Sequence, residues 1–183
     1  MGTIRVHEFT TLDGVIDAPT WAGDYPFDPR MGEAIGSLMG GCKAILLGRY
    51  TFEMFAPAWS QRTAAEDPGA PFMNDSPKYV VAATPPSVEW AKTTVLGGYD
   101  ATRLRRLKED VDGGIYVSGS GTLVRAMMRD GLVDELHLFV YPIVSGSGSR
   151  LFGDDTSAAK LELETCEPYV GGVVRLTYRV PHS

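Results

Sequence analysis

A glycine-rich turn is the segment whose residue types and spacing could do chemistry. The apolar run of residues 115–117 is followed by Gly119-Ser120-Gly121, and a helical pattern begins at Thr122 and Leu123. The backbone N–H groups and the dipole at a helix N-terminus favour a phosphate, and glycine lets that phosphate approach the backbone. Val124 stands where the G-x-G-x-x-G dinucleotide fingerprint has its third glycine, so an ordinary strand-to-helix turn is the alternative.

Three further strand ends carry glycine or polar residues. They are Leu12-Asp13-Gly14, Gly48-Arg49-Tyr50-Thr51 and Ala83-Thr84. Ligands of open α/β sheets bind beyond the carboxyl ends of the strands, so the four ends together predict a site for a phosphate-bearing ligand. In that site Gly48 would let the backbone approach a phosphate, Arg49 would supply charge and Thr51 a hydroxyl.

The elements that must position these residues alternate between strand-like and helical patterns. Strands are predicted near residues 4–9, 44–47, 79–83, 93–96, 115–118 and 136–141, and helices near 29–39, 50–55, 101–111 and 122–130. Residues 56–77 have the composition of a loop, and residues 160–165 and 173–180 predict a closing antiparallel hairpin. The pattern predicts an α/β fold with a mixed, mainly parallel sheet flanked by helices, in one domain of residues 1–183.

The composition excludes several classes of function. A net charge of −6 argues against a nucleic-acid partner, and no apolar run approaches the length of a membrane span. The N-terminus lacks a signal-peptide pattern, and Cys42 and Cys166 are typical of reduced thiols, so we expect a cytoplasmic protein. No zinc site is expected, because the three histidines are scattered; His137, in an apolar strand, is interpreted as a core residue.

Several segments also resemble one family in their order along the chain. They include Leu12-Asp13-Gly14, Gly48-Arg49-Tyr50-Thr51, Gly119-Ser120-Gly121-Thr122-Leu123, Gly131-Leu132-Val133-Asp134-Glu135-Leu136 and Gly146-Ser147-Gly148-Ser149-Arg150-Leu151-Phe152. The chain resembles the reductase domain of the bifunctional riboflavin-pathway deaminase–reductase, over nearly its whole length. The resemblance implies the three-layer fold of dihydrofolate reductase. The zinc motifs of the deaminase half are absent from this sequence.

The resemblance implies an NADPH-dependent reductase that transfers a hydride to a small heterocyclic C=N or C=O substrate, and a homodimer. The residues that it implies for binding NADP(H) are Ile16, Gly48, Arg49, Thr51, Thr84, Gly119, Ser120, Gly121, Thr122 and Leu123. In particular, the loop containing Asp13 through Ile16 would close over the nicotinamide. Arg49 favours NADP over NAD, because a guanidinium suits the additional phosphate.

Asp13 and Glu33 are the candidate catalytic residues. Asp13 would face the substrate, although a turn aspartate bonded to its own backbone is an equal alternative. The acidic residue of folate reductases would fall on Gly32, one position before Glu33, which as a solvated helix-face residue has a second interpretation. The aromatic side chains that could wall a planar substrate, or belong to the core, are Trp21, Phe27 and Trp59. Tyr141, at the end of an apolar strand, could reach the pocket.

Two other functions remain open from the sequence. One is a non-enzymatic, nucleotide-binding dimer that kept the fold without the chemistry. The other is a true dihydrofolate reductase, which the shifted position of the helix acid disfavours. Binding of NADPH without hydride transfer would favour the first alternative, and turnover of dihydrofolate would favour the second.

Overall fold

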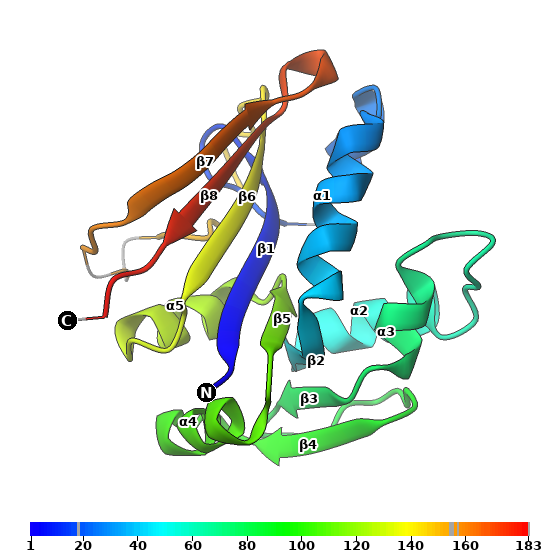
Figure 1. The fold of residues 1–183 in the computed structure, drawn as a ribbon, viewed down its shortest axis with the longest axis vertical. Helices are drawn as coiled ribbons and strands as arrows, with labels where there is room; N and C mark the ends of the chain where they lie inside the picture. The colour runs from blue at the N-terminus through cyan, green and yellow to red at the C-terminus, as the bar shows by residue number, and fades with distance from the viewer. Residues whose placement is uncertain (18, 154–155, 157, 183) are drawn as a thin grey trace.

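An eight-stranded sheet runs through the centre of the protein (Figure 1). This computed structural model describes residues 1–17, 19–153, 156 and 158–182. The strands lie in the order β4-β3-β2-β5-β1-β6-β8-β7. Their bounds are β1 Thr3–Thr11, β2 Cys42–Gly48, β3 Lys78–Val81, β4 Thr93–Gly97, β5 Gly114–Ser118, β6 Glu135–Tyr141, β7 Glu162–Pro168 and β8 Val174–Arg179.

The sheet is mixed and mainly parallel. β1 pairs in parallel with β5 and β6, β2 with β3 and β5, and β3 with β4. The pairs β6–β8 and β7–β8 are antiparallel. The predicted sheet and its closing hairpin are therefore confirmed, and the carboxyl ends of β1, β2, β3 and β5 meet at one edge.

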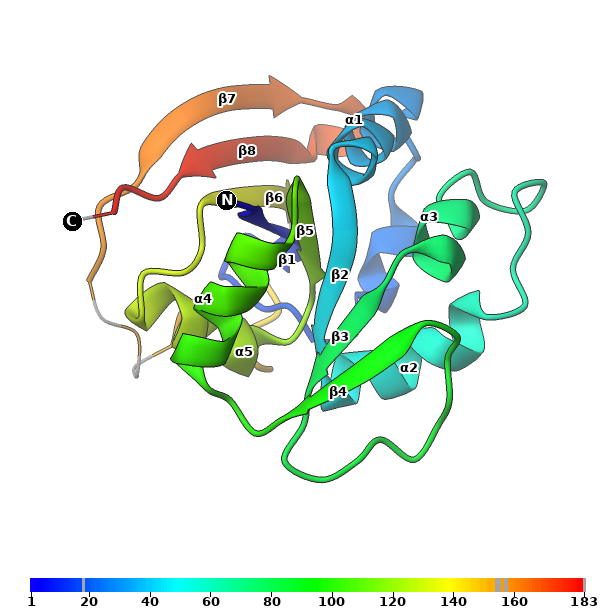
Figure 2. The same cartoon turned by 60° about the horizontal axis from the view of Figure 1, so that its bottom comes forward.

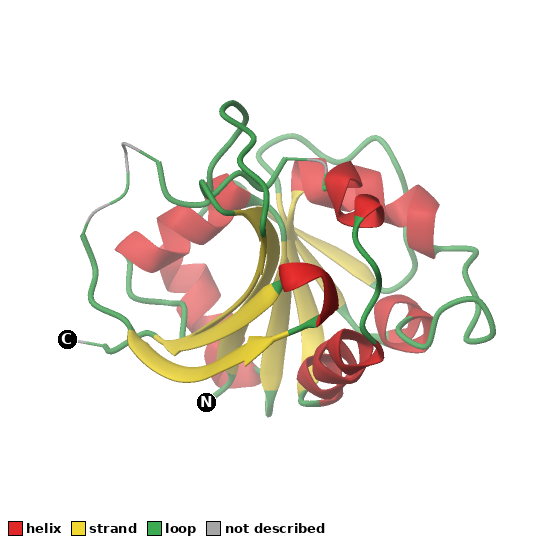
Figure 3. Ribbon diagram, turned by 90° about the horizontal axis from the view of Figure 1, so that it is seen from above, coloured by secondary structure: helices red, strands yellow, loops and turns green. Residues whose placement is uncertain are grey.

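Helices cover both faces of the sheet, which makes three layers (Figures 2 and 3). Side chains from α1 (Pro29–Gly40), α2 (Arg49–Trp59) and α3 (Ala70–Asp75) share a core on one face. Side chains from α4 (Ala101–Asp110) and α5 (Gly121–Arg129) share the core on the other face. The described residues also form two short 3-10 helices, Thr20–Asp24 and Val170–Gly172.

Three helix ends carry residue types that favour the beginning or the end of a helix. The Asp28 side chain accepts a hydrogen bond from the Arg30 N–H at the start of α1, and Asp100 caps α4. Gly131 follows α5 with a φ of +63°, the left-handed conformation that ends a helix.

The prediction of a loop over residues 56–77 is wrong at both ends. α2 continues to Trp59 with Pro57 inside it, and α3 occupies Ala70–Asp75. A proline near the N-terminus of a helix lacks only an N–H that would have no helical partner. Pro71 stands in the first turn of α3 and is compatible with that helix.

The alternation of β1 side chains assigns its residues to the two faces. Val6 belongs to the core beneath α4 and α5, whereas Phe9 packs against the core beneath α1. Since successive side chains of a strand point to opposite faces, Glu8 shares the face of Val6 and His7 shares the face of Phe9.

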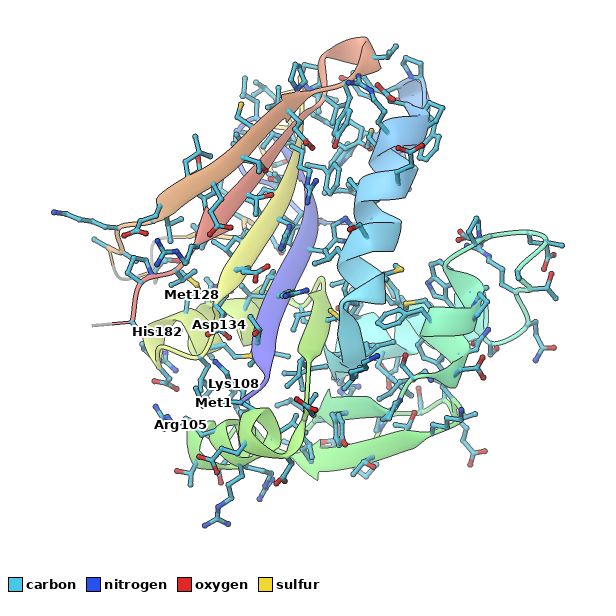
Figure 4. The ribbon with its side chains drawn as sticks, in the orientation of Figure 1. Met1, Arg105, Lys108, Met128, Asp134 and His182 are labelled. Carbon is cyan, nitrogen blue, oxygen red and sulfur yellow. The ribbon has the colours of Figure 1, made fainter. Side chains whose placement is uncertain are left out.

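A charged cluster holds the amino end of β1 (Figure 4). The Asp134 carboxylate accepts hydrogen bonds from the Ile4 N–H at 2.6 Å and from Lys108 Nζ at 2.7 Å, and it lies 2.7 Å from His182 Nε2. Lys108 is buried and also donates to the Leu132 carbonyl. This cluster connects β1, α4 and the C-terminal segment at the end of the strand away from the predicted ligand edge, so its role is structural.

Candidate functional site

A large cleft opens where β1 and β5 separate. Their pairing ends at His7 and Ser118, while β1 continues beside β6 to Thr11. The cleft has a volume of about 1910 Å³. Pockets for single small ligands span roughly 300–1,000 Å³, so this cleft has room for a dinucleotide and a second molecule.

The glycine-rich turn and the turn after β2 are locked together. Ser120 adopts a left-handed conformation with a φ of +66°, and its Oγ accepts a hydrogen bond from the Gly48 N–H at 2.8 Å. The same hydroxyl donates to Thr51 Oγ1 at 2.7 Å. A Cβ on Gly48 would lie 2.7 Å from Ser120 Oγ, and a Cβ on Gly119 would lie 3.1 Å from Thr51. Glycine is therefore required at positions 48 and 119, where the two turns meet. The Ser120 and Thr51 hydroxyls fix the shape of this junction between the turns.

Two helices begin at this junction and face the cleft. Neither α2 nor α5 has a side-chain hydrogen bond capping its N-terminus. The first backbone N–H groups of a helix have no partner inside the helix, and with the helix dipole they attract an anion. The uncapped turns fit the phosphates of a dinucleotide.

The cleft brings together most of the residues implied for the cofactor and one candidate acid. The predicted residues that line it are Ile16, Glu33, Gly48, Arg49, Thr51, Gly119, Ser120, Gly121, Thr122 and Leu123. Arg49 is half-exposed and lies 3.3 Å from Glu53 one helical turn away. Such an exposed pair contributes little stability, so the guanidinium can turn toward a ligand at low cost.

Asp13 lies outside the cleft lining and has other partners. Its carboxylate accepts hydrogen bonds from the Thr11 hydroxyl at 2.6 Å and from the Ser145 and Gly146 N–H groups at 3.0 and 2.9 Å. These bonds, led by that of Thr11, hold the pKa of Asp13 well below its ordinary value. The structure thus favours the turn interpretation of Asp13, which joins the loop after β1 to the loop after β6.

The remaining candidate residues lie at the surface, in the cleft or in the core. Thr84 is exposed and does not line the cleft. Phe27 and Trp59 do line it, together with the exposed Tyr50. Trp21 and Tyr141 instead pack against each other, with ring centroids 4.9 Å apart. His137 is buried and contacts Glu135 at 2.9 Å, as expected of a core residue with a partner.

Sequence reasoning missed three polar residues inside the cleft. His7, Glu8 and Tyr116 line it, and all three are buried. His7 Nδ1 shares a 2.7 Å hydrogen bond with the Tyr116 hydroxyl, while His7 Nε2 and Glu8 Oε1 have no partner among the described residues. The signal in the sequence was the adjacent polar pair His7-Glu8 between the apolar residues Val6 and Phe9 of a predicted strand, since buried polar groups ordinarily have partners.

Burial shifts the pKa values of this group away from their ordinary range. Burial, with smaller contributions from His137 and Arg175, lowers the pKa of His7 to about 3. Burial raises the pKa of Glu8 to about 8, and the Gly119 backbone N–H opposes that rise. Both side chains are therefore neutral at pH 7. Strongly shifted groups in a cleft mark a functional site.

The sheet order, the parallel strand ends and the cleft between β1 and β5 define the fold of the dihydrofolate reductase class. The family model described as the RibD C-terminal domain matches residues 2–175. The chain belongs to this family, which confirms the resemblance found in the sequence.

Three solved structures share this fold over nearly all of the chain. A putative riboflavin biosynthesis protein from Shewanella sp. PV-4 is 21% identical with a TM-score of 0.80, covering 98% of this chain and 99% of the other. The diaminohydroxyphosphoribosylaminopyrimidine deaminase/5-amino-6-(5-phosphoribosylamino)uracil reductase of Thermotoga maritima is 16% identical with a TM-score of 0.66, covering 98% of this chain and 57% of the other. Dihydrofolate reductase from Enterococcus faecalis, complexed with NADP(H), is 14% identical with a TM-score of 0.66, covering 99% and 98%.

Two further properties concern the described residues alone. No helix among them is long and apolar enough to cross a membrane. No group of three or more His, Cys, Asp or Glu side chains among them is placed to hold a metal ion.

Proposed function

We propose that this protein is an NADPH-dependent reductase that transfers a hydride to the C=N or C=O bond of a small heterocycle. The observation that carries the proposal is the pair of uncapped helix N-termini locked together at the mouth of a cleft. Membership of a family with reductase members supports a reductase-type function. When bound, the reduced nicotinamide supplies the hydride, and the protein supplies position and electrostatics.

Different residues of this chain would bind different phosphates of NADPH. The N–H groups of Gly121, Thr122 and Leu123 at the start of α5 would hold phosphate, as would those at the start of α2. Arg49, at the first position of α2, would contact the additional phosphate that distinguishes NADPH from NADH. A Cβ on Gly121 would come within 2.8 Å of Ile16 Cδ1, so the loop after β1 packs directly over the glycine-rich turn.

The α1 side of the cleft suits a planar, largely apolar substrate. Phe27 and Tyr50 remain exposed at 69% and 73%, although both line the cleft. Exposed aromatic side chains at the mouth of a cleft can cover the faces of a ring when a ligand binds. With Trp59 they favour a heterocycle over an aliphatic substrate.

Replacing Arg49 with alanine tests the proposed cofactor. We expect wild-type protein to bind NADPH more tightly than NADH. Arg49→Ala should weaken NADPH binding about tenfold or more and NADH binding about twofold, because a hydrogen bond to a charged group contributes about 1.5–3 kcal/mol. Nicotinamide fluorescence during titration measures both affinities. Arg103→Ala, on α4 away from the cleft, is the matched control.

Each outcome of that titration decides between functions. Equal losses for the two dinucleotides would remove the assigned role of Arg49, and absence of binding by the wild type would remove the reductase proposal. Binding should be followed by NADPH oxidation with 5-amino-6-(5-phosphoribosylamino)uracil and with 7,8-dihydrofolate as probes. If the protein binds NADPH but oxidises it with neither probe, a non-enzymatic nucleotide-binding protein is favoured.

A second copy of the chain is the partner that we propose. All seven residues of β7 are exposed, and β7 forms an edge of the sheet. The unpaired backbone groups of an edge strand can pair with another chain. Sedimentation should therefore give the mass of a dimer, and Leu163→Asp, at a position 55% exposed on β7, should shift it toward a monomer. A monomeric wild type would contradict this proposal.

A further inference from the structure

Glu8 is a buried carboxyl group that faces the cleft without an ion-pair partner. It lies on β1 one residue beyond the last pairing of β1 with β5, and its exposed fraction is 4%. Its Oε1 atom is buried and has no hydrogen-bond partner among the described residues. A polar atom in this position costs stability unless a ligand satisfies it.

The groups around Glu8 leave its carboxyl neutral. Within the described chain no Lys, Arg or His forms an ion pair with it. The Gly119 N–H of the glycine-rich turn lies close to the Glu8 carboxyl. On β1, His7 points to the other face of the sheet and pairs there with the Tyr116 hydroxyl of β5, whose pKa a charge on Glu8 would raise through space. The charged side chains lining the cleft are Asp17 after β1, Glu33 on α1, Arg49 on α2, Glu66 and Asp67 before α3, and Arg125 on α5. Burial is the largest influence on the pKa of Glu8, which it raises to about 8.

Other carboxyl groups near the cleft are poorly suited to hold a proton. Asp13 accepts three hydrogen bonds that stabilise its charged form. Asp17 is exposed and accepts the Ser149 N–H. Glu33 is exposed on α1. Reduction of a C=N or C=O bond nevertheless requires a proton on the heteroatom.

We propose that Glu8 is the catalytic acid of the cleft, which gives its carboxyl proton to the substrate nitrogen or oxygen beside the carbon that is reduced. This assignment rests on the proposed reductase function. The substrate carbon gains the hydride and its electron pair from the reduced dinucleotide, while the C=N or C=O π bond breaks. The heteroatom takes the proton, Glu8 becomes a carboxylate, and solvent water restores its proton after the product leaves. The substrate class is therefore a heterocycle with a hydrogen-bond acceptor at the reducible bond.

The protonation of Glu8 can be tested without turnover. The carbonyl stretch of a protonated carboxyl is expected in the infrared spectrum of the ligand-free wild type at neutral pH, and it should fade with a midpoint near pH 8. Glu8→Gln should remove this band. Glu109→Gln, at an exposed position on α4, should leave it unchanged. Absence of the band from the wild type at neutral pH would overturn the proposal.

Proton transfer is tested in single turnovers with the two probes named above. Glu8→Gln should slow hydride transfer about a hundredfold or more, while the Kd of NADPH changes less than about threefold. The wild-type rate should fall above pH 8, and this alkaline loss should be absent in Glu8→Gln. An unchanged rate, or a loss confined to NADPH binding, would overturn the assignment.

A probe that binds without being reduced still gives a decisive result. Formation of the complex with NADPH and that probe should shift the Glu8 carbonyl band, because the carboxyl donates to the heteroatom. An unshifted band would overturn the proposal even if Glu8 is protonated. Failure of the reductase proposal itself is recognised separately, because the wild-type protein then fails to bind NADPH, or binds it without oxidising it in the presence of either probe, whatever the infrared band of Glu8 shows.

Discussion

Replacing Glu8 with glutamine is expected to remove a loss of stability that the wild type suffers as the pH rises. The folded-state pKa of Glu8 is about 8, above its ordinary value of 4.5, because the carboxyl is buried. Between these values the folded protein keeps a proton that the unfolded chain has released. The free energy of unfolding therefore falls with rising pH across this window, by on the order of 4 kcal/mol.

His7 makes the free energy of unfolding rise with pH, over a range that begins at lower pH. Its folded-state pKa is about 3, below its ordinary value of 6.5, so the unfolded chain binds a proton that the folded protein does not. Stability from this residue is complete above pH 6.5 and is lost as the pH falls toward 3. The two contributions oppose each other between pH 4.5 and 6.5, and we expect the pair to favour the folded state most in that interval.

Urea unfolding of the wild type and of Glu8→Gln at about pH 5, 7 and 9 measures this effect. The variant should gain stability relative to the wild type at each step upward in pH. Glu109→Gln is the control, since its carboxyl is exposed on α4. Parallel curves for wild type and Glu8→Gln would show that Glu8 is ionised in the folded protein.

The sequence predicted those elements of the fold whose local residue preferences match the structure that they adopt. The helices predicted near residues 29–39 and 101–111 form α1 and α4, and aspartates, which favour the N-cap position, stand directly before them as Asp28 and Asp100. The apolar segment predicted at residues 136–141 forms β6 between β1 and β8. Residues 70–75 were missed because α3 is short and is held by burial of Ala70 and Met73. That burial depends on contacts with distant elements, which local propensity does not contain.

The candidate site likewise contains some residues that the sequence predicted and others that it did not. The glycines at 48, 119 and 121 were recognised because backbone geometry restricts the residue type at such turns. The part played by Ser120, whose hydroxyl joins two turns that are distant in sequence, depends on strand order. Glu8 was missed for the same reason: only the separation of β1 from β5 places its carboxyl in a cleft rather than in a satisfied core.

Replacing Lys78 with methionine is expected to destabilise the protein by about 3 kcal/mol without changing NADPH binding. Lys78 is completely buried at the start of β3, and its Nζ donates to the carbonyl oxygens of Asn74, Ser76 and Ala91, each at 3.0 Å. Methionine keeps the apolar stem but leaves three carbonyl groups without this donor. The site lies at the amino end of β3, whereas the cleft lies at the carboxyl ends of the strands.

The size of this effect depends on two opposing contributions. Burial lowers the pKa of Lys78 to about 8, so holding the charge costs free energy that methionine would recover. Against this, the ammonium lies 4.6 Å from the centre of the Trp90 ring, and it neutralises carbonyls near the end of α3, where the helix dipole is negative. Urea unfolding of Lys78→Met measures which contribution is larger. Lys43→Met, at an exposed position on β2, is the control variant. A loss below about 1 kcal/mol would mean that water replaces the ammonium at these carbonyls.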